Sequence, residues 1–287
     1  MNVLVATDGS KYGRWAMNWV ATLPLAEPIQ VTALHVVDIA ALRAPFLAQP
    51  VIAGTERYIQ EEIQRMEARS GKALKEAKQQ LALLKLKGTV RKEQGAVAST
   101  ILNRAPKREG LLVVGSQGLD ALDRFMLGSV STNLIHHATC PVLVIKGEAV
   151  PLRRITLATD GSDASAKALA FVLSKFRPDV FAGNGEHVPI HVSVVHVMPL
   201  VKYPGLKKVG DKILEQSVRK LVEAGFTAEP VCRFGKPAEE IMKAASKERA
   251  DLIVMGAQGL GAVARFLIGS VSTRVVQHAN CAVLVVR

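Results

Sequence analysis

Short hydrophobic runs alternate with longer amphipathic segments along the whole chain. The runs are rich in Val, Ile and Leu, which is typical of buried parallel strands, and the segments between them carry hydrophobic residues at helical spacing. The pattern predicts an α/β fold, with right-handed crossovers and helices on both faces of parallel sheets. The predicted strands lie near residues 2–7, 30–37, 89–94, 111–115 and 141–146, and near 154–159, 190–197, 227–233, 252–256 and 282–287.

The second half of this pattern repeats the first. The run NVLVATDGS at 2–10 returns as ITLATDGS at 155–162, and LLVVG at 111–115 returns as LIVMG at 252–256. The order of these landmarks is kept, while the loops between them differ in length. We therefore predict two tandem domains, 1–147 and 152–287, each an open five-stranded parallel sheet. Because the linker between them is too short to be a long flexible tether, we expect the domains to pack together.

A glycine motif occurs once in each half, with the form G-x-x-G, nine residues, G-S. Each copy follows a predicted strand and precedes a predicted helix, at 129–138 or 270–279, and 12 of 18 aligned positions are identical. Glycines allow close approach of a ligand to the backbone, and amide groups at a helix N-terminus bind anions. The serine can cap the helix or contact the anion. The motif predicts two phosphate-binding loops, and a merely tight connection is the alternative.

Two aspartates recur beside these loops. Asp8 and Asp160 each follow the first strand of a half, as the glycines follow the fourth. In open parallel sheets, ligands bind beyond the carboxyl ends of the strands at the switch point. The Asp8 and Gly115 segments both lie at such ends, so we expect both to border the ligand site.

The net charge and the aromatic content give limited information about the kind of molecule that the protein binds. The formal charge is +12, spread as 18 basic minus 12 acidic residues through Gly147 and 19 minus 13 afterwards, so each half carries +6. Such basicity suits a nucleotide or another polyanion, and equally a solvated surface. With 8 Phe, 3 Tyr and 2 Trp, and no basic segment interleaved with aromatics, the chain does not resemble a nucleic-acid-binding protein.

Cysteine usage and hydropathy indicate a cytoplasmic protein. Cys140, Cys232 and Cys281 lack C-x-x-C spacing, so we expect buried, reduced thiols. The N-terminus does not read as a secretory signal, and no window reaches the roughly 18 consecutive apolar residues of a membrane span.

The spacing of the glycine motif, the early Asp and the LHV segment of the second strand together resemble the universal stress protein family. The resemblance covers both halves, and it implies a Rossmann-like fold that binds ATP where the glycine motif is present. It assigns Asp8 and Asp160 to the ribose or base and Val36 and Val197 to adenine. Ala6 and Ala158 depart from the pattern, since some members carry proline there. The phosphate-binding run would be Val114, Gly115, Gly118, Gly128, Ser129 and Val130, with Met255, Gly256, Gly259, Gly269, Ser270 and Val271 as counterparts.

The two halves are not equivalent. Asp120 and Asp123 stand in the first loop where the second has Gly261 and Ala264. Carboxylates close to a polyphosphate repel it by about 1 kcal/mol or more per pair, so we predict tighter binding in the second half. The alternative is that these aspartates face solvent or hold a metal ion. A charged helical run at 55–87, much longer than its counterpart, is expected to be a solvated packing helix, and a partner-binding lid is the alternative.

Catalytic groups are harder to find than binding groups. His35 and His196 recur inside apolar runs, which favours core histidines, and G-x-x-x-x-G-K-[ST] is absent. The leading hypothesis is an ATP-binding regulatory protein, with Mg²⁺ unassigned, whose shape change an unknown partner protein reads. The alternatives are a slow ATP hydrolase and a ligand-free module whose last strands form an intramolecular pseudo-dimer; a homodimer is a further possibility.

Overall fold

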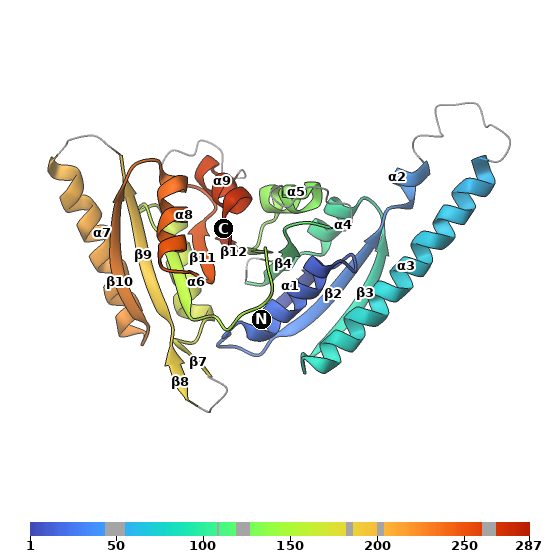
Figure 1. The fold of residues 1–287 in the computed structure, drawn as a ribbon, viewed down its shortest axis with the longest axis horizontal. Helices are drawn as coiled ribbons and strands as arrows, with labels where there is room; N and C mark the ends of the chain where they lie inside the picture. Colours follow the sequence, from blue (N-terminus) through green and yellow to red (C-terminus); the bar gives the residue numbers. More distant parts are fainter. Residues whose placement is uncertain (44–54, 108, 119–126, 182–185, 200–203, 260–267) are drawn as a thin grey trace.

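The computed structural model describes residues 1–43, 55–107, 109–118, 127–181, 186–199, 204–259 and 268–287. Its centre is one ten-stranded sheet in the order β10-β9-β6-β11-β12-β5-β4-β1-β2-β3 (Figure 1). The first half supplies β1 (Asn2–Ala6), β2 (Gln30–Val37), β3 (Gly88–Gln94), β4 (Leu111–Gly115) and β5 (Val142–Ile145). The second half supplies β6 (Arg154–Ala158), β9 (His191–Met198), β10 (Thr227–Phe234), β11 (Leu252–Gly256) and β12 (Ala282–Val286).

The two halves join through their last strands. Strand β5 pairs with β12 in antiparallel fashion, with Val144 opposite Val283 and Val142 opposite Val285, while the other strand pairs of this ten-stranded sheet are parallel. All four residues are buried. The sequence predicted two five-stranded sheets, and the structure fuses them into one.

Helices cover both faces of the sheet, as predicted. The first half contributes α1 (Lys11–Thr22), α2 (Ile39–Arg43), α3 (Thr55–Leu83), α4 (Val97–Arg104) and α5 (Ser129–His137). The second contributes α6 (Asp163–Lys175), α7 (Pro204–Glu223), α8 (Pro237–Lys247) and α9 (Ser270–His278). One apolar layer packs α1, α3, α6 and α7 against the sheet, and the other packs α4, α5, α8 and α9 against its opposite face.

The ten predicted strands are all present, which confirms the α/β fold. The sequence missed the small hairpin of β7 (Asp179–Phe181) and β8 (His187–Pro189), and the short helix α2. The charged run forms the 29-residue helix α3, which buries Ala73, Ala77 and Leu81 against the sheet. The packing interpretation of this helix is therefore confirmed.

The edges of the sheet are polar. Strand β3 carries Arg91, Lys92 and Glu93 along one edge, and β10 carries Pro230, which has no N–H to offer a further strand, along the other. Charges and proline are features that protect sheet edges from pairing with other chains. Within the described residues, no helix is long and apolar enough to cross a membrane.

Candidate functional site

The strand order places a switch point in each half. Strand β1 lies between β2 and β4, and β6 lies between β9 and β11. The loop after the central strand and the glycine loop after its neighbour therefore meet beyond the same edge of the sheet. A Cβ added to Gly118 would lie 2.8 Å from Asp8 Oδ2, and one added to Gly259 would lie 2.6 Å from Asp160 Oδ2. Aspartate and glycine loop are in direct proximity, as the sequence predicted.

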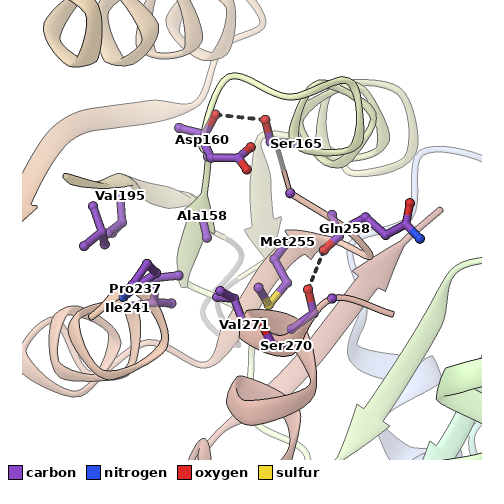
Figure 2. A pocket seen from close by; sticks show the side chains of 16 residues that line it. Ala158, Asp160, Ser165, Val195, Pro237, Ile241, Met255, Gln258, Ser270 and Val271 are labelled. Carbon is purple, nitrogen blue, oxygen red and sulfur yellow. Dashed lines mark hydrogen bonds between the residues drawn. The ribbon is translucent and has the colours of Figure 1, made fainter. Parts of the chain in front are cut away.

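The second half contains a cavity of about 340 Å³ at this point (Figure 2). All eight predicted residues of this half line it, and they are Asp160, Val197, Met255, Gly256, Gly259, Gly269, Ser270 and Val271. Val195, Val197 and Ile241 supply apolar surface, while the N-terminus of α9 and the loop after β11 supply backbone. The cavity therefore has an apolar side and a side rich in backbone amides.

The first half contains the corresponding cavity, of about 260 Å³. Five of the eight predicted residues line it: Asp8, Val36, Val114, Gly115 and Val130. Gly118, Gly128 and Ser129 do not line it, although Gly118 lies beside Asp8. Gly128 in turn lies beside Gly118, since a Cβ added to Gly128 would lie 4.0 Å from the Gly118 amide nitrogen, so the first half has the same loop arrangement around a smaller cavity.

The turn after the first strand is built in the same way in both halves. Asp160 Oδ1 accepts hydrogen bonds from the Ser162 amide at 3.0 Å and from Ser162 Oγ at 2.5 Å, and Asp8 Oδ1 accepts from the Ser10 amide at 2.9 Å. The glycine between each pair has a φ near +80°, a conformation that favours glycine. One carboxylate oxygen is thereby fixed in the turn, and Oδ2 is directed to the glycine loop.

Two histidines support these turns. His35 Nδ1 lies 2.8 Å from the Thr7 carbonyl oxygen, and His196 Nδ1 lies 2.8 Å from that of Thr159. Each carbonyl belongs to the residue before the aspartate. The prediction of hydrogen-bonded core histidines is confirmed, and each ring positions the turn that carries the aspartate.

The last glycine of each motif is the N-cap of a helix. The Gly269 amide donates to the Ala257 carbonyl at 2.7 Å, and Ser272 Oγ donates to the Gly256 carbonyl at 2.9 Å, which fixes α9 to the end of β11. Gly128 and Ser131 make the same bonds in the first half. No side chain caps either helix, so the capping alternative for Ser129 and Ser270 is wrong, and these serines are the first helical residues. Amides of an uncapped first turn are donors suited to an anion.

Gly128 and Gly269 are not required by the protein's own geometry. Their φ angles are −62° and −71°, and a Cβ added to either would meet its nearest neighbour at 3.5 or 3.4 Å, an ordinary contact. Gly256 differs, because a Cβ there would lie 2.5 Å from the Ala164 carbonyl carbon. Among the described residues, the last glycine therefore leaves space between the helix N-terminus and the glycine loop.

Sequence reasoning missed the contribution of α4 and α8. Val97 and Ile101 line the first cavity, and their counterparts Pro237 and Ile241 line the second. The signal was present, because residues 96–105 and 236–245 match in the repeat. Gln117, Gln258 and Ser165 were also missed as lining residues.

Some predictions fall on residues that the structure does not describe. Asp120 and Asp123 lie outside the described residues, as do Gly261 and Ala264. Within the described part of the chain, no group of three or more His, Cys, Asp or Glu side chains could hold a metal ion. The prediction of buried thiols is confirmed for Cys140, whereas Cys232 and Cys281 are half-buried. Burial raises the pKa of the Cys140 and Cys281 thiols to about 11.

Comparison with known proteins extends across the whole chain. A model of the universal stress protein family matches residues 1–146 and 151–287. A universal stress protein of Mycolicibacterium smegmatis is 28% identical over 99% of this chain and 96% of its own. A crystal structure of a universal stress protein from Archaeoglobus fulgidus covers 100% of this chain and 96% of its own, with a TM-score of 0.69 and 21% identity, and so shares the fold. Another from that organism, in complex with dAMP, covers 47% of this chain and 98% of its own, with 25% identity and a TM-score of 0.36.

Proposed function

The chain belongs to the universal stress protein family, and we propose that it is a regulatory protein that binds ATP in both cavities, more tightly in the second. The observation that carries the proposal is the space at Gly269. A glycine that neither backbone conformation nor neighbouring atoms require adjoins uncapped helix amides and an apolar cavity. A phosphate group fits that combination, because it accepts several backbone hydrogen bonds and needs close approach.

In the proposed complex, each part of the nucleotide has a matching surface. Adenine would lie on the apolar side, against Val195, Val197 and Met255. The ribose would lie at Asp160, whose second carboxylate oxygen faces the glycine loop. The phosphates would lie at Gly259, Gly269 and the first turn of α9. The first cavity would bind in the same way through Asp8, Val36 and the start of α5.

Regulation through binding is favoured over catalysis by the kind of donor in the site. Backbone amides hold a phosphate without supplying a general base or the lysine of a P-loop. Binding of the phosphates would give a shape change for a partner protein to read. Mg²⁺, the partner protein and a cytoplasmic location stay predictions.

Native mass spectrometry of the gently purified full chain, combined with calorimetric titration of ATP, tests the proposal. We expect nucleotide at up to two equivalents, and loss of ATP binding in the double variant Gly128→Val/Gly269→Val. Gly147→Val is the matched control, because a Cβ at Gly147 meets nothing within 4 Å and the residue lies outside both cavities. A chain that takes up no nucleotide would refute the proposal. If the parent chain releases phosphate from ATP and the double variant does not, the protein is a slow ATP hydrolase and the regulatory proposal is wrong.

A further inference from the structure

An ion-pair cluster joins the two helices that line the second cavity. Arg274 Nη2 on α9 lies 3.4 Å from Glu239 Oε1 on α8, and Lys236 Nζ lies 3.5 Å from the same oxygen. Lys236 directly precedes Pro237, and Arg274 lies one turn beyond Ser270; both Pro237 and Ser270 line the cavity (Figure 2). Two cations and one carboxylate therefore stand beside the cavity.

The position of Arg274 on its helix directs it to the phosphate end of the site. Residues four apart share a helix face, and helical side chains lean toward the N-terminus of their helix. Arg274 thus leans over the turn that begins at Ser270, where the uncapped amides lie. A turn of helix rises only about 5.4 Å, which is within the reach of an extended arginine side chain.

Among the described residues, the first cavity has no such cluster. The repeat places Ala96, Ser99 and Asn133 at the positions of Lys236, Glu239 and Arg274. All three are uncharged, and Ser99 Oγ donates to the Ala96 carbonyl within its own helix. The cluster is therefore a property of the second half, while the glycine loop and helix start are common to both.

We propose that Arg274 binds the outer phosphates of a nucleotide in the second cavity and makes this site select nucleoside triphosphates over monophosphates. The inference rests on the proposed function of the cavity. A guanidinium forms paired hydrogen bonds with phosphate oxygens, and it adds a positive charge that backbone amides do not carry. Glu239 competes with the phosphates for the same guanidinium and so limits the affinity.

The ion pair is suited to such an exchange. The Arg274 side chain is 58% exposed and that of Glu239 34% exposed. Exposed ion pairs add little to stability, so transfer of the guanidinium to a phosphate loses little. After the transfer, Lys236 stays within range to neutralise Glu239. The carboxylate is then not left without a partner.

Calorimetric titration of the full chain with ATP and with AMP tests this inference. The chain carries Gly128→Val, so that the second cavity is measured alone. We expect Arg274→Ala to weaken ATP about tenfold and AMP less than twofold, and Arg274→Lys to restore part of the loss. Glu239→Gln is expected to tighten ATP about threefold, because the competing carboxylate is removed.

The two variants break the same ion pair and therefore separate binding from structure. If the pair served only to hold α8 to α9, both variants would shift ATP and AMP alike and in the same direction, which would overturn the inference. An unchanged ratio of ATP to AMP affinity in Arg274→Ala would overturn it too. In a chain that carries Gly269→Val in place of Gly128→Val, only the first cavity is measured. Adding Arg274→Ala to that chain must leave the ATP affinity of the first cavity unchanged. If the starting chain binds neither nucleotide, the proposed function itself fails.

Discussion

The two cavities are assembled from repeated parts, yet they differ in size and completeness. The second has about 340 Å³ and is lined by all eight of its predicted residues, whereas the first has about 260 Å³ and is lined by five. The backbone features are shared, including the Asp turn, the histidine that supports it and the uncapped helix. What differs are side chains around the rim and walls. The same repeated backbone motif therefore carries two cavities with different walls.

Residue differences at equivalent lining positions distinguish the two cavities. Val114 in the first cavity corresponds to Met255, and Gly13 corresponds to Ser165. A Cβ at Gly13 would lie 2.5 Å from Thr7 Oγ1, whereas Ser165 Oγ accepts a hydrogen bond from Thr159 Oγ1 at 3.3 Å. The first half thus needs a glycine because of the way Thr7 packs, and the second half has a hydroxyl pair in its place.

The largest effect is expected when the space beside the last glycine is filled in one half at a time. Gly269→Val puts a branched side chain into the space beside the helix amides, and we expect ATP to weaken on the order of 100-fold at the second site while the first site is unchanged. Gly128→Val should do the reverse, because Gly128 stands beside the first glycine loop as Gly269 stands beside the second. Two-site calorimetry measures both. Equal losses at both sites from either variant would contradict separate sites.

Equivalent basic residues, Lys146 and Arg287, follow the paired strands β5 and β12 at the junction of the two halves. Lys146 Nζ donates to the Gln277 carbonyl at 3.0 Å, and the equivalent Arg287 donates to the Ile135 carbonyl. Burial lowers the pKa of Lys146 to about 8, from a usual value near 10.5. Between these values the unfolded chain binds more protons than the folded chain, so this lysine makes stability rise with pH.

We therefore expect Lys146→Met to gain in stability relative to the parent chain by about 2 kcal/mol more at pH 7.5 than at pH 10.5. The figure allows for the partial exposure of the lysine. Urea unfolding at the two pH values measures the difference. The exposed Lys167→Met is the control and should show no such dependence. A pH-independent difference for Lys146→Met would show that folding does not lower the pKa of this lysine.

A third test concerns the aspartates. Asp160→Asn keeps a side-chain oxygen for the Ser162 amide but removes the carboxylate charge, and we expect about tenfold weaker ATP binding at the second site. The parent chain should prefer ATP over 2′,3′-dideoxy-ATP, and the variant should lose most of that preference. Competition titration gives both numbers. If the preference persists, the ribose does not contact Asp160.

The smallest expected effect concerns the first loop. Asp120→Gly with Asp123→Ala removes two charges that the second loop lacks, and we expect ATP affinity at the first site to rise about fivefold. The measurement is a titration in the Gly269→Val background. No gain would mean that the aspartates face solvent or hold a metal ion, and the ranking of the sites would then rest on the rim and walls.

Much of the fold was predictable from two features of the sequence, the pattern of strands and helices and the glycine spacing, because both are local and occur in each half. The alternation of short runs with helical segments identified all ten strands of the main sheet, including the polar edge strands β3 and β10, and the glycine spacing identified the starts of α5 and α9. The antiparallel join of β5 and β12 has no signature of its own, because an apolar strand reads the same whether it is an edge or is paired on both sides. The hairpin β7–β8 was missed because three-residue strands carry too little pattern.

The glycine loop and the aspartate of the site could be predicted from the sequence. The apolar side chains that α8 adds to the cavity lining could not. Gly259 and Asp160 could be paired in advance, since both follow neighbouring strands. Pro237 and Ile241 could not, because an apolar helix position next to a ligand looks the same in sequence as one in a core. The cluster at Arg274 needs three residues from two helices, and their proximity is a tertiary property.

The pairing of β5 with β12 also constrains how the protein is made. During synthesis, Val142–Ile145 emerges well over a hundred residues before Ala282–Val286. At about 5–20 residues per second, the outer edge of this fully apolar strand waits on the order of ten seconds for its partner. For that interval the nascent chain presents an unprotected edge with none of the charges or proline found on β3 and β10. The seam that unites the finished molecule is therefore its point of greatest exposure to aggregation on the ribosome.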